Sequence, residues 1–168
     1  MLVVRTDITR KLRSAKLLLV NLSVFGEKNE SPDYGTIWKY EPGMLTEELE
    51  SAGVDLLGFR SGSRVPLKTA NSLKIRNISV KADKKKDLLK QLDGNYSFKD
   101  IVLLGAEQSD IEIARLSSFS IATASSPLEL KMDSDFVSNF SGIDVFQEIG
   151  NLILNAKGPY RQYKAKSV

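Results

Sequence analysis

Short runs rich in valine, isoleucine and leucine alternate along this chain with segments whose apolar residues have helical spacing. This alternation favours a parallel sheet, because parallel strands are joined by crossover helices that bury both faces of the sheet. Strands are expected at residues 16–22, 54–59, 76–80, 101–104 and 119–122. The sequence therefore predicts an α/β fold with a mostly parallel sheet and helices on both faces.

Helices are expected between these strands and after the last one. Thr46 is expected to cap the first, and Ser109 and Glu112 stand in capping-box spacing at the start of the fourth. Gly158-Pro159 is expected to end the last helix, because proline cannot continue one freely. The predicted helices are residues 46–52, 65–73, 83–92, a segment opening at Ser109, and 143–156.

A small β-hairpin is expected at residues 34–40, where aromatic and β-branched side chains gather after a turn at Ser31-Pro32-Asp33. At 168 residues, 42% of them hydrophobic, the chain suits one domain. Its core is expected at about 14–158, with a basic tail at 159–168.

Several functions are disfavoured by composition. The chain has no cysteine and no histidine, which excludes thiolate sites, histidine-zinc sites and Ser-His-Asp triads. A net charge of +3 gives weak grounds for nucleic-acid binding, and none is expected. The longest apolar run, residues 17–20, is too short to span a membrane, so a cytoplasmic protein without membrane contact is expected.

Ligands of an open parallel sheet bind beyond the carboxyl ends of its strands, so the residues just after each strand are the candidate functional residues. Polar and glycine residues gather at four such places. They are residues 20–26, 58–63, 81–84 and 105–110.

The chain resembles the haloacid dehalogenase superfamily, and most closely its 3-deoxy-D-manno-octulosonate 8-phosphate phosphatases and the C-terminal domain of sialic acid cytidylyltransferases. The resemblance covers roughly residues 14–158 and rests on the strand order, the hairpin and the segments 50–59, 81–84, 100–110 and 119–127. It implies a three-layer Rossmann-like fold with a hairpin insertion and no large cap domain.

In that family one aspartate attacks phosphorus, a second shuttles a proton, and further carboxylates hold Mg²⁺. Carried over by position, the nucleophile falls on Asn21, the acid/base on Ser23 and the first metal carboxylate on Ala106. None of these side chains can perform the role of a carboxylate. The resemblance therefore implies a phosphatase with degenerate catalytic positions and no cofactor.

The family also holds the phosphoryl group with a hydroxyl and a lysine. These roles fall on Arg60, with Ser61 one residue beyond, and on Lys84, with Lys85 close enough to leave the register open. Arg60, Ser61 and Lys84 could bind substrate, or be an ordinary polar loop and a solvated helix turn. Glu107 and Asp110 could hold a cation, or simply favour a helix N-terminus.

The favoured interpretation is an inactive phosphatase-like domain that oligomerises, scaffolds or regulates in sialic or octulosonic acid metabolism. One alternative is a sugar-acid or nucleotide binding module. Another is a Mg²⁺-dependent phosphatase with relocated carboxylates at Glu107, Asp110 and Glu27. The resemblance also implies a homotetramer, with a cytidylyltransferase as a possible partner, and with Trp38 and Tyr40 either at a subunit contact or packed within the hairpin.

Overall fold

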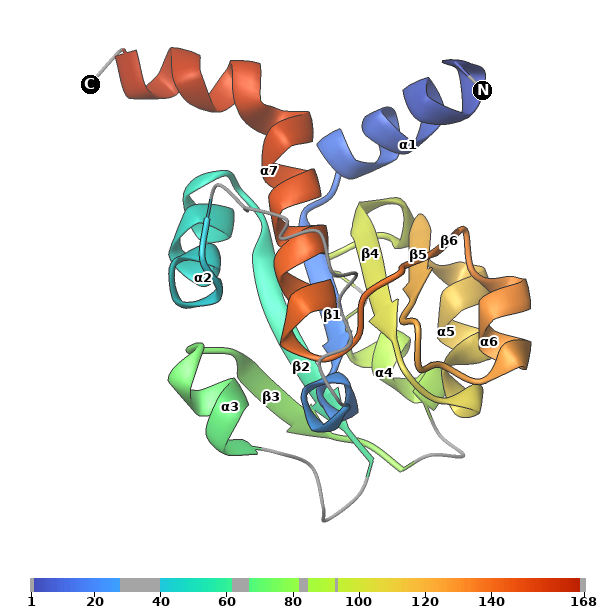
Figure 1. Ribbon diagram of the computed structural model, residues 1–168. Helices are drawn as coiled ribbons and strands as arrows, with labels where there is room; N and C mark the ends of the chain where they lie inside the picture. The colour runs from blue at the N-terminus through green and yellow to red at the C-terminus, as the bar shows by residue number, and fades with distance from the viewer. Residues whose placement is uncertain (1, 28–39, 62–66, 82–84, 93, 167–168) are drawn as a thin grey trace.

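The computed structural model describes residues 2–27, 40–61, 67–81, 85–92 and 94–166. Within these ranges six strands form one sheet in the order β3-β2-β1-β4-β5-β6, and every neighbouring pair is parallel (Figure 1). The strands are β1 (Leu17–Asn21), β2 (Asp55–Arg60), β3 (Arg76–Ser79), β4 (Ile101–Gly105), β5 (Phe119–Ala122) and β6 (Phe136–Val137).

The predicted strands are confirmed because the central ones are apolar throughout. All five residues of β1 and all five of β4 are buried, as expected for strands covered on both faces. The two-residue strand β6 was not predicted, since so short a segment carries no alternating pattern.

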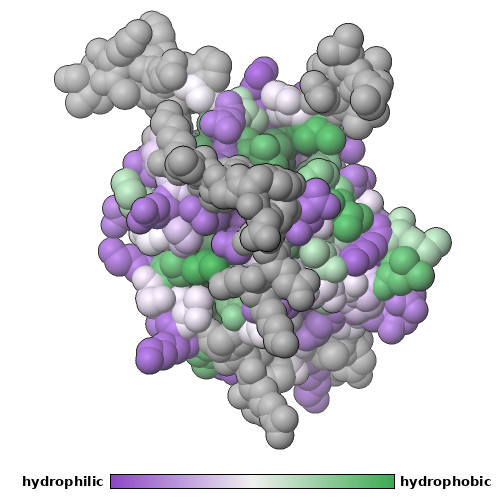
Figure 2. Space-filling model, viewed as in Figure 1, coloured by the Kyte–Doolittle hydropathy of each residue, from purple (hydrophilic) through white to green (hydrophobic). Residues whose placement is uncertain are grey.

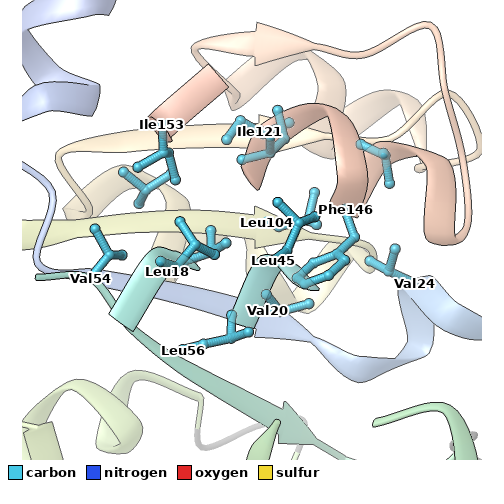
Figure 3. Close-up of a cluster of buried hydrophobic side chains, with 14 of the residues drawn as sticks. Leu18, Val20, Val24, Leu45, Val54, Leu56, Leu104, Ile121, Phe146 and Ile153 are labelled. Carbon is cyan, nitrogen blue, oxygen red and sulfur yellow. The ribbon is translucent and has the colours of Figure 1, made fainter. Parts of the chain in front are cut away.

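Helices cover both faces of the sheet, which confirms the three-layer α/β prediction. Leucines and phenylalanines of one layer pack on one face, and Figure 3 shows Leu45, Phe146 and Ile153 lying over Leu18 and Leu104. That layer comprises α1 (Leu2–Arg13), α2 (Pro42–Ser51), α3 (Leu67–Ser72) and α7 (Ile143–Lys166). The other face is covered by α4 (Lys85–Leu92), α5 (Ile111–Leu116) and α6 (Leu128–Asp133).

Two predicted helix boundaries are wrong. Helix α2 begins at Pro42 with Glu41 as N-cap, because proline suits the first turn; Thr46 lies inside the helix and donates to the Leu73 carbonyl at 2.6 Å. Helix α7 does not end at Gly158-Pro159 but continues to Lys166, and Figure 1 shows it bending in its last part. A proline within a helix removes one hydrogen bond and bends the axis without always stopping the helix.

The capping of α5 also differs from the prediction. A short 3₁₀ turn, η4 (Gln108–Asp110), precedes α5, and the Asp110 carboxylate accepts the backbone N–H of Glu107. Ser109 instead contacts a lysine. Helices α1 and α6 were not predicted, and the segment 159–166 expected as a tail belongs to α7.

Part of the predicted hairpin, residues 34–39 with Trp38, lies outside the described residues, as does Lys84. Tyr40 is described, and its backbone is held against α7. The Tyr40 N–H donates to Asn151 Oδ1 at 3.0 Å, and Asn151 Nδ2 donates back to the Tyr40 carbonyl at 3.1 Å. This contact fixes the chain where it enters α2.

The turn after β1, η1 (Leu22–Gly26), is set by close packing against two neighbours. Leu22 lies over Gly58 of β2, where a β-carbon would stand 2.4 Å from Leu22 Cδ2, so any other residue there would require Leu22 to move. Phe25 meets Phe146 of α7 edge to face, with ring centroids 5.5 Å apart. These contacts hold η1, and with it Ser23, at the carboxyl edge of the sheet.

The surface mixes polar and apolar side chains. Figure 2 shows hydrophilic and hydrophobic residues interspersed over one face, and Leu128 and Met132 of α6 are 68% and 78% exposed. No described helix combines the length and hydropathy that crossing a bilayer requires.

Candidate functional site

The candidate site lies at the carboxyl edge of three adjacent strands. Strands β2, β1 and β4 are neighbours and end at Arg60, Asn21 and Gly105. Because parallel strands end at the same edge, residues from segments far apart in the sequence converge there. The N-terminus of α4, which begins at Lys85, reaches the same place.

Asp110 is the centre of this site and is completely buried. Its Oδ2 atom accepts the backbone N–H groups of Ala106 at 2.8 Å and Glu107 at 3.0 Å. The same oxygen accepts Asn21 Nδ2 at 2.8 Å, while Oδ1 accepts Lys85 Nζ at 2.5 Å. Four donors therefore converge on one carboxylate, which ties the turn after β4 to β1 and α4.

Lys85 is the cation of the site, and its side chain is only 1% exposed. Its ammonium donates to Asp110 Oδ1, to Glu107 Oε2 at 2.8 Å and to Ser109 Oγ at 2.7 Å. An ammonium group has three protons, so its donor capacity is filled. The Phe59 ring also lies beneath it, with Nζ 5.5 Å from the centroid.

Glu107 forms the outer side of the site, with its side chain 40% exposed. Its Oε2 atom accepts Ser61 Oγ at 3.3 Å as well as the Lys85 ammonium. Burial by itself would raise the pKa of Glu107, but the hydrogen bond and charge of Lys85, with hydrogen bonds from Ser23 and Ser61, lower it overall. Glu107 is therefore an ionised partner of Lys85 at neutral pH.

Asn21 joins the first strand to this network through both ends of its amide. Its nitrogen donates to Asp110, and its oxygen accepts the N–H of Ser23 at 3.0 Å and the hydroxyl of Ser23 at 2.7 Å. The amide orientation follows from these partners, because only nitrogen can donate to a carboxylate. The Ser23 hydroxyl thus donates to a neutral amide, which cannot accept its proton as a general base would, and it also lies beside the Glu107 carboxylate that is paired with Lys85.

Mg²⁺ is the ion that the resemblance described above implies at this edge, and the described residues do not fit it. Mg²⁺ requires oxygen ligands in near-octahedral geometry, usually including carboxylates. Here Glu107 and Asp110 are already paired with Lys85, Asn21 offers only an amide, and Ala106 offers no side-chain ligand. Among the residues that the structure describes, no group of three or more acidic side chains that could hold a metal ion is present.

The structure brings together five of the residues singled out from the sequence: Asn21, Ser23, Ser61, Glu107 and Asp110. Arg60 points elsewhere, with Nε 3.4 Å from Asn77 Oδ1, since successive strand residues face opposite sides of the sheet. Ala106 contributes its backbone N–H. The described lysine of the site is Lys85, the neighbour of Lys84.

Ser109 is the site residue that sequence reasoning assigned differently. It was expected to cap a helix, but its hydroxyl accepts Lys85 Nζ. No pattern in the sequence distinguishes these two uses of a serine before a helix. The contact between Ser109 and Lys85 depends on α4 packing beside the turn that precedes α5.

Glu27 belongs to a second polar cluster, built from the ends of η1 and β5. Its carboxylate accepts Thr123 Oγ1 at 2.9 Å and the N–H of Gly142 at 3.2 Å. Burial raises the pKa of Glu27, while these two hydrogen bonds oppose that shift. Glu27 holds the start of α7 and has its own partners, separate from Lys85.

Replacing Glu107 with glutamine should weaken the protein at neutral pH and not in acid. The folded-state pKa of Glu107 is below its ordinary value of 4.5, so its stabilising contribution is present above that value and disappears as pH falls through the folded pKa. Urea midpoints of the wild type and Glu107→Gln should therefore differ at pH 7 and converge once the pH falls below the folded-state pKa of Glu107.

The exposed Glu129 of α6 provides the control. The Glu129→Gln variant should follow the wild type at both pH values. A Glu107→Gln midpoint equal to the wild type at pH 7 would contradict the pairing with Lys85.

No protein-family model and no curated protein matches the chain, whereas many solved structures share its fold. A HAD superfamily (subfamily III A) hydrolase from Legionella pneumophila superposes with a TM-score of 0.75 at 16% identity, over 93% of this chain and 91% of that one. A 3-deoxy-D-manno-octulosonate 8-phosphate phosphatase from Moraxella catarrhalis, in complex with magnesium, phosphate and KDO, gives 0.74 at 19% identity, over 97% and 99%. The corresponding Yersinia pestis phosphatase gives 0.72 at 17% identity, over 90% and 87%.

These likenesses confirm the predicted fold. The chain has the architecture of haloacid dehalogenase-type phosphatases over nearly its whole length. At sequence identities of 16–19% these structures show a shared fold and no more, so the activity must be argued from the residues of the site.

Proposed function

We propose that this chain is a phosphatase-fold protein that does not transfer phosphoryl groups and acts instead by assembly or regulation. One observation carries the proposal. The amide of Asn21, at the position expected for the nucleophile, is hydrogen-bonded to Asp110 and Ser23. Lys85 forms ion pairs with both nearby carboxylates, those of Glu107 and Asp110.

The described residues of the site do not provide the nucleophile and the proton donor that an aspartate phosphatase uses. An amide is a far weaker nucleophile than a carboxylate, and the carboxylate near the serine two residues on, that of Glu107, is ion-paired with Lys85, which lowers its pKa and makes it a weaker base. The alternative with relocated carboxylates is less supported, because Glu27 is engaged with Thr123 and Gly142. Glu107 and Asp110 would have to leave Lys85 to bind a metal.

A sugar-acid or nucleotide binding module at the same edge is also less supported. Arg60 contacts Asn77, and the Lys85 ammonium is saturated by protein acceptors. Among the described residues of the site, the exposed charged group is the Glu107 carboxylate, which repels anionic ligands.

For the assembly role we propose a homotetramer, working in sialic or octulosonic acid metabolism with a cytidylyltransferase as a possible partner. Exposed Leu128 and Met132 on α6 add apolar surface that an assembly could cover. Light scattering of the purified chain, whose mass is 18.6 kDa, measures this directly. A monomer at micromolar concentration would contradict the tetramer.

The catalytic proposal is tested by phosphate release from p-nitrophenyl phosphate and from 3-deoxy-D-manno-octulosonate 8-phosphate, with Mg²⁺ present. The wild type should release phosphate no faster than the Asn21→Ala variant, with circular dichroism confirming that both are folded. Metal-dependent turnover by the wild type that disappears in Asn21→Ala would overturn the proposal.

A further inference from the structure

A cavity of about 670 Å³ opens at the opposite edge of the sheet from the candidate site. Residues at the amino ends of three strands line it: Leu17 of β1, Asp55 of β2 and Arg76 of β3. Ligand cavities of 300–1,000 Å³ usually combine apolar walls with a few polar groups. The cavity is of that size and has both kinds of lining.

The cavity exists because α4 does not cover the whole of its face of the sheet. Helix α4 ends at Leu92, and the chain turns through Gly94, whose φ of +95° favours glycine. After this turn Tyr96 lies against the sheet. Its backbone N–H donates a hydrogen bond to the Leu92 carbonyl, and its hydroxyl donates one to the Asp55 carboxylate. Leu57, on the strand beyond, is left only partly buried.

The walls are apolar and the rim carries a guanidinium. Aliphatic surface comes from three strands and α4, through Leu17, Leu57, Ile78 and Leu92. Arg76 stands directly opposite Leu57 in the β2–β3 register, so its charge borders that surface. Within the described ranges, no carboxylate forms an ion pair with Arg76.

The remaining acid of the rim already has a partner. Asp55 accepts the Tyr96 hydroxyl, and burial followed by the bond and charge of Asp55 raise the pKa of Tyr96 to about 12. Tyr96 therefore keeps its proton and remains the donor at neutral pH. Among the described residues that line the cavity, the cationic group is Arg76 and the acid is Asp55, so an anionic ligand has to pair with Arg76 on the side away from the Asp55 carboxylate.

We propose that this cavity binds a small aromatic or alicyclic carboxylate, whose ring lies on Leu17, Leu57 and Leu92 and whose carboxylate pairs with Arg76. A guanidinium recognises a carboxylate by two parallel hydrogen bonds, which gives direction as well as charge. The site is independent of the carboxyl-edge network, so its failure would leave the proposed function untouched.

The test uses 2-naphthoate as probe and the full chain, followed by ¹H–¹⁵N NMR titration at pH 7. Saturable shifts should appear at amides lining the cavity, among them Leu57, Ile78 and Asn95. The Arg76→Gln variant should bind at least fivefold more weakly. Arg10→Gln, at an exposed arginine of α1, should bind like the wild type.

Neutral 2-naphthamide provides a comparison that needs no variant. It should bind the wild type at least fivefold more weakly than 2-naphthoate, and Arg76→Gln should no longer distinguish the two. Equal affinity of the wild type and Arg76→Gln for 2-naphthoate would overturn the proposal. So would the absence of saturable shifts up to 10 mM probe, a concentration about tenfold above a weak, 1 mM Kd.

Discussion

Replacing Lys85 with methionine should lower the free energy of unfolding by about 3–5 kcal/mol, because it leaves a buried carboxylate without its counter-ion. Lys85 and Asp110 are 1% and 0% exposed, so water cannot replace the missing ammonium. Methionine keeps much of the aliphatic stem over Phe59 and removes the charge and the three hydrogen bonds. Denaturant unfolding followed by circular dichroism measures the loss.

The exposed pair Lys74–Glu47 is the matched control. Its side chains are 73% and 70% exposed, so Lys74→Met should cost less than about 1 kcal/mol. Similar losses for Lys85→Met and Lys74→Met would show that the buried pair contributes no more than a surface one.

Replacing Asp110 with alanine should cost at least as much as Lys85→Met. The change removes the acceptor of two backbone N–H groups and of Asn21, and each unsatisfied buried donor costs about 1–3 kcal/mol. It also leaves the Lys85 ammonium buried beside Glu107 alone. Since small domains have only about 5–15 kcal/mol of stability, this variant should be close to unfolding at 25 °C.

The double variant Lys85→Met/Asp110→Ala separates charge pairing from hydrogen bonding. Removing both ions should cost less than the sum of the single changes, because neither leaves the other unpaired. Strict additivity would contradict a direct pairing. Asp133→Ala, at the more exposed ion pair with Arg115, should cost less than about 1 kcal/mol.

The sheet could be predicted from the sequence because its central strands are buried on both faces. Their short, continuous apolar runs are typical of strands in a parallel sheet that is covered by helices on both faces. Helix α6 and strand β6, six and two residues long, are too short to show a period. Helix α7 continues past Pro159 with a bend, and the local sequence does not determine whether a proline bends a helix or ends it.

The sequence predicted that several of these residues lie near one another, and only the structure shows how they are paired. The resemblance placed Asn21 and Asp110 at one edge, but sequence could not choose between Lys84 and Lys85. In the described residues Lys85, the first residue of α4, is directed toward the sheet and pairs with Asp110. A shift of one residue turns a helical side chain by about 100°, and the sequence alone does not fix where the helix begins. Arg60 and Ser61 likewise have different partners, because successive residues along a strand face opposite sides of the sheet. The sequence does not show which of the two faces the site.

Because the Lys85 ammonium neutralises the carboxylates at the site, we expect that no catalytic metal is held there. Calorimetric titration of the full chain with Mg²⁺ at pH 7 measures this. We expect no saturable heat up to 10 mM Mg²⁺, roughly tenfold above a weak, 1 mM Kd. Stoichiometric binding that Glu107→Gln abolishes would contradict it.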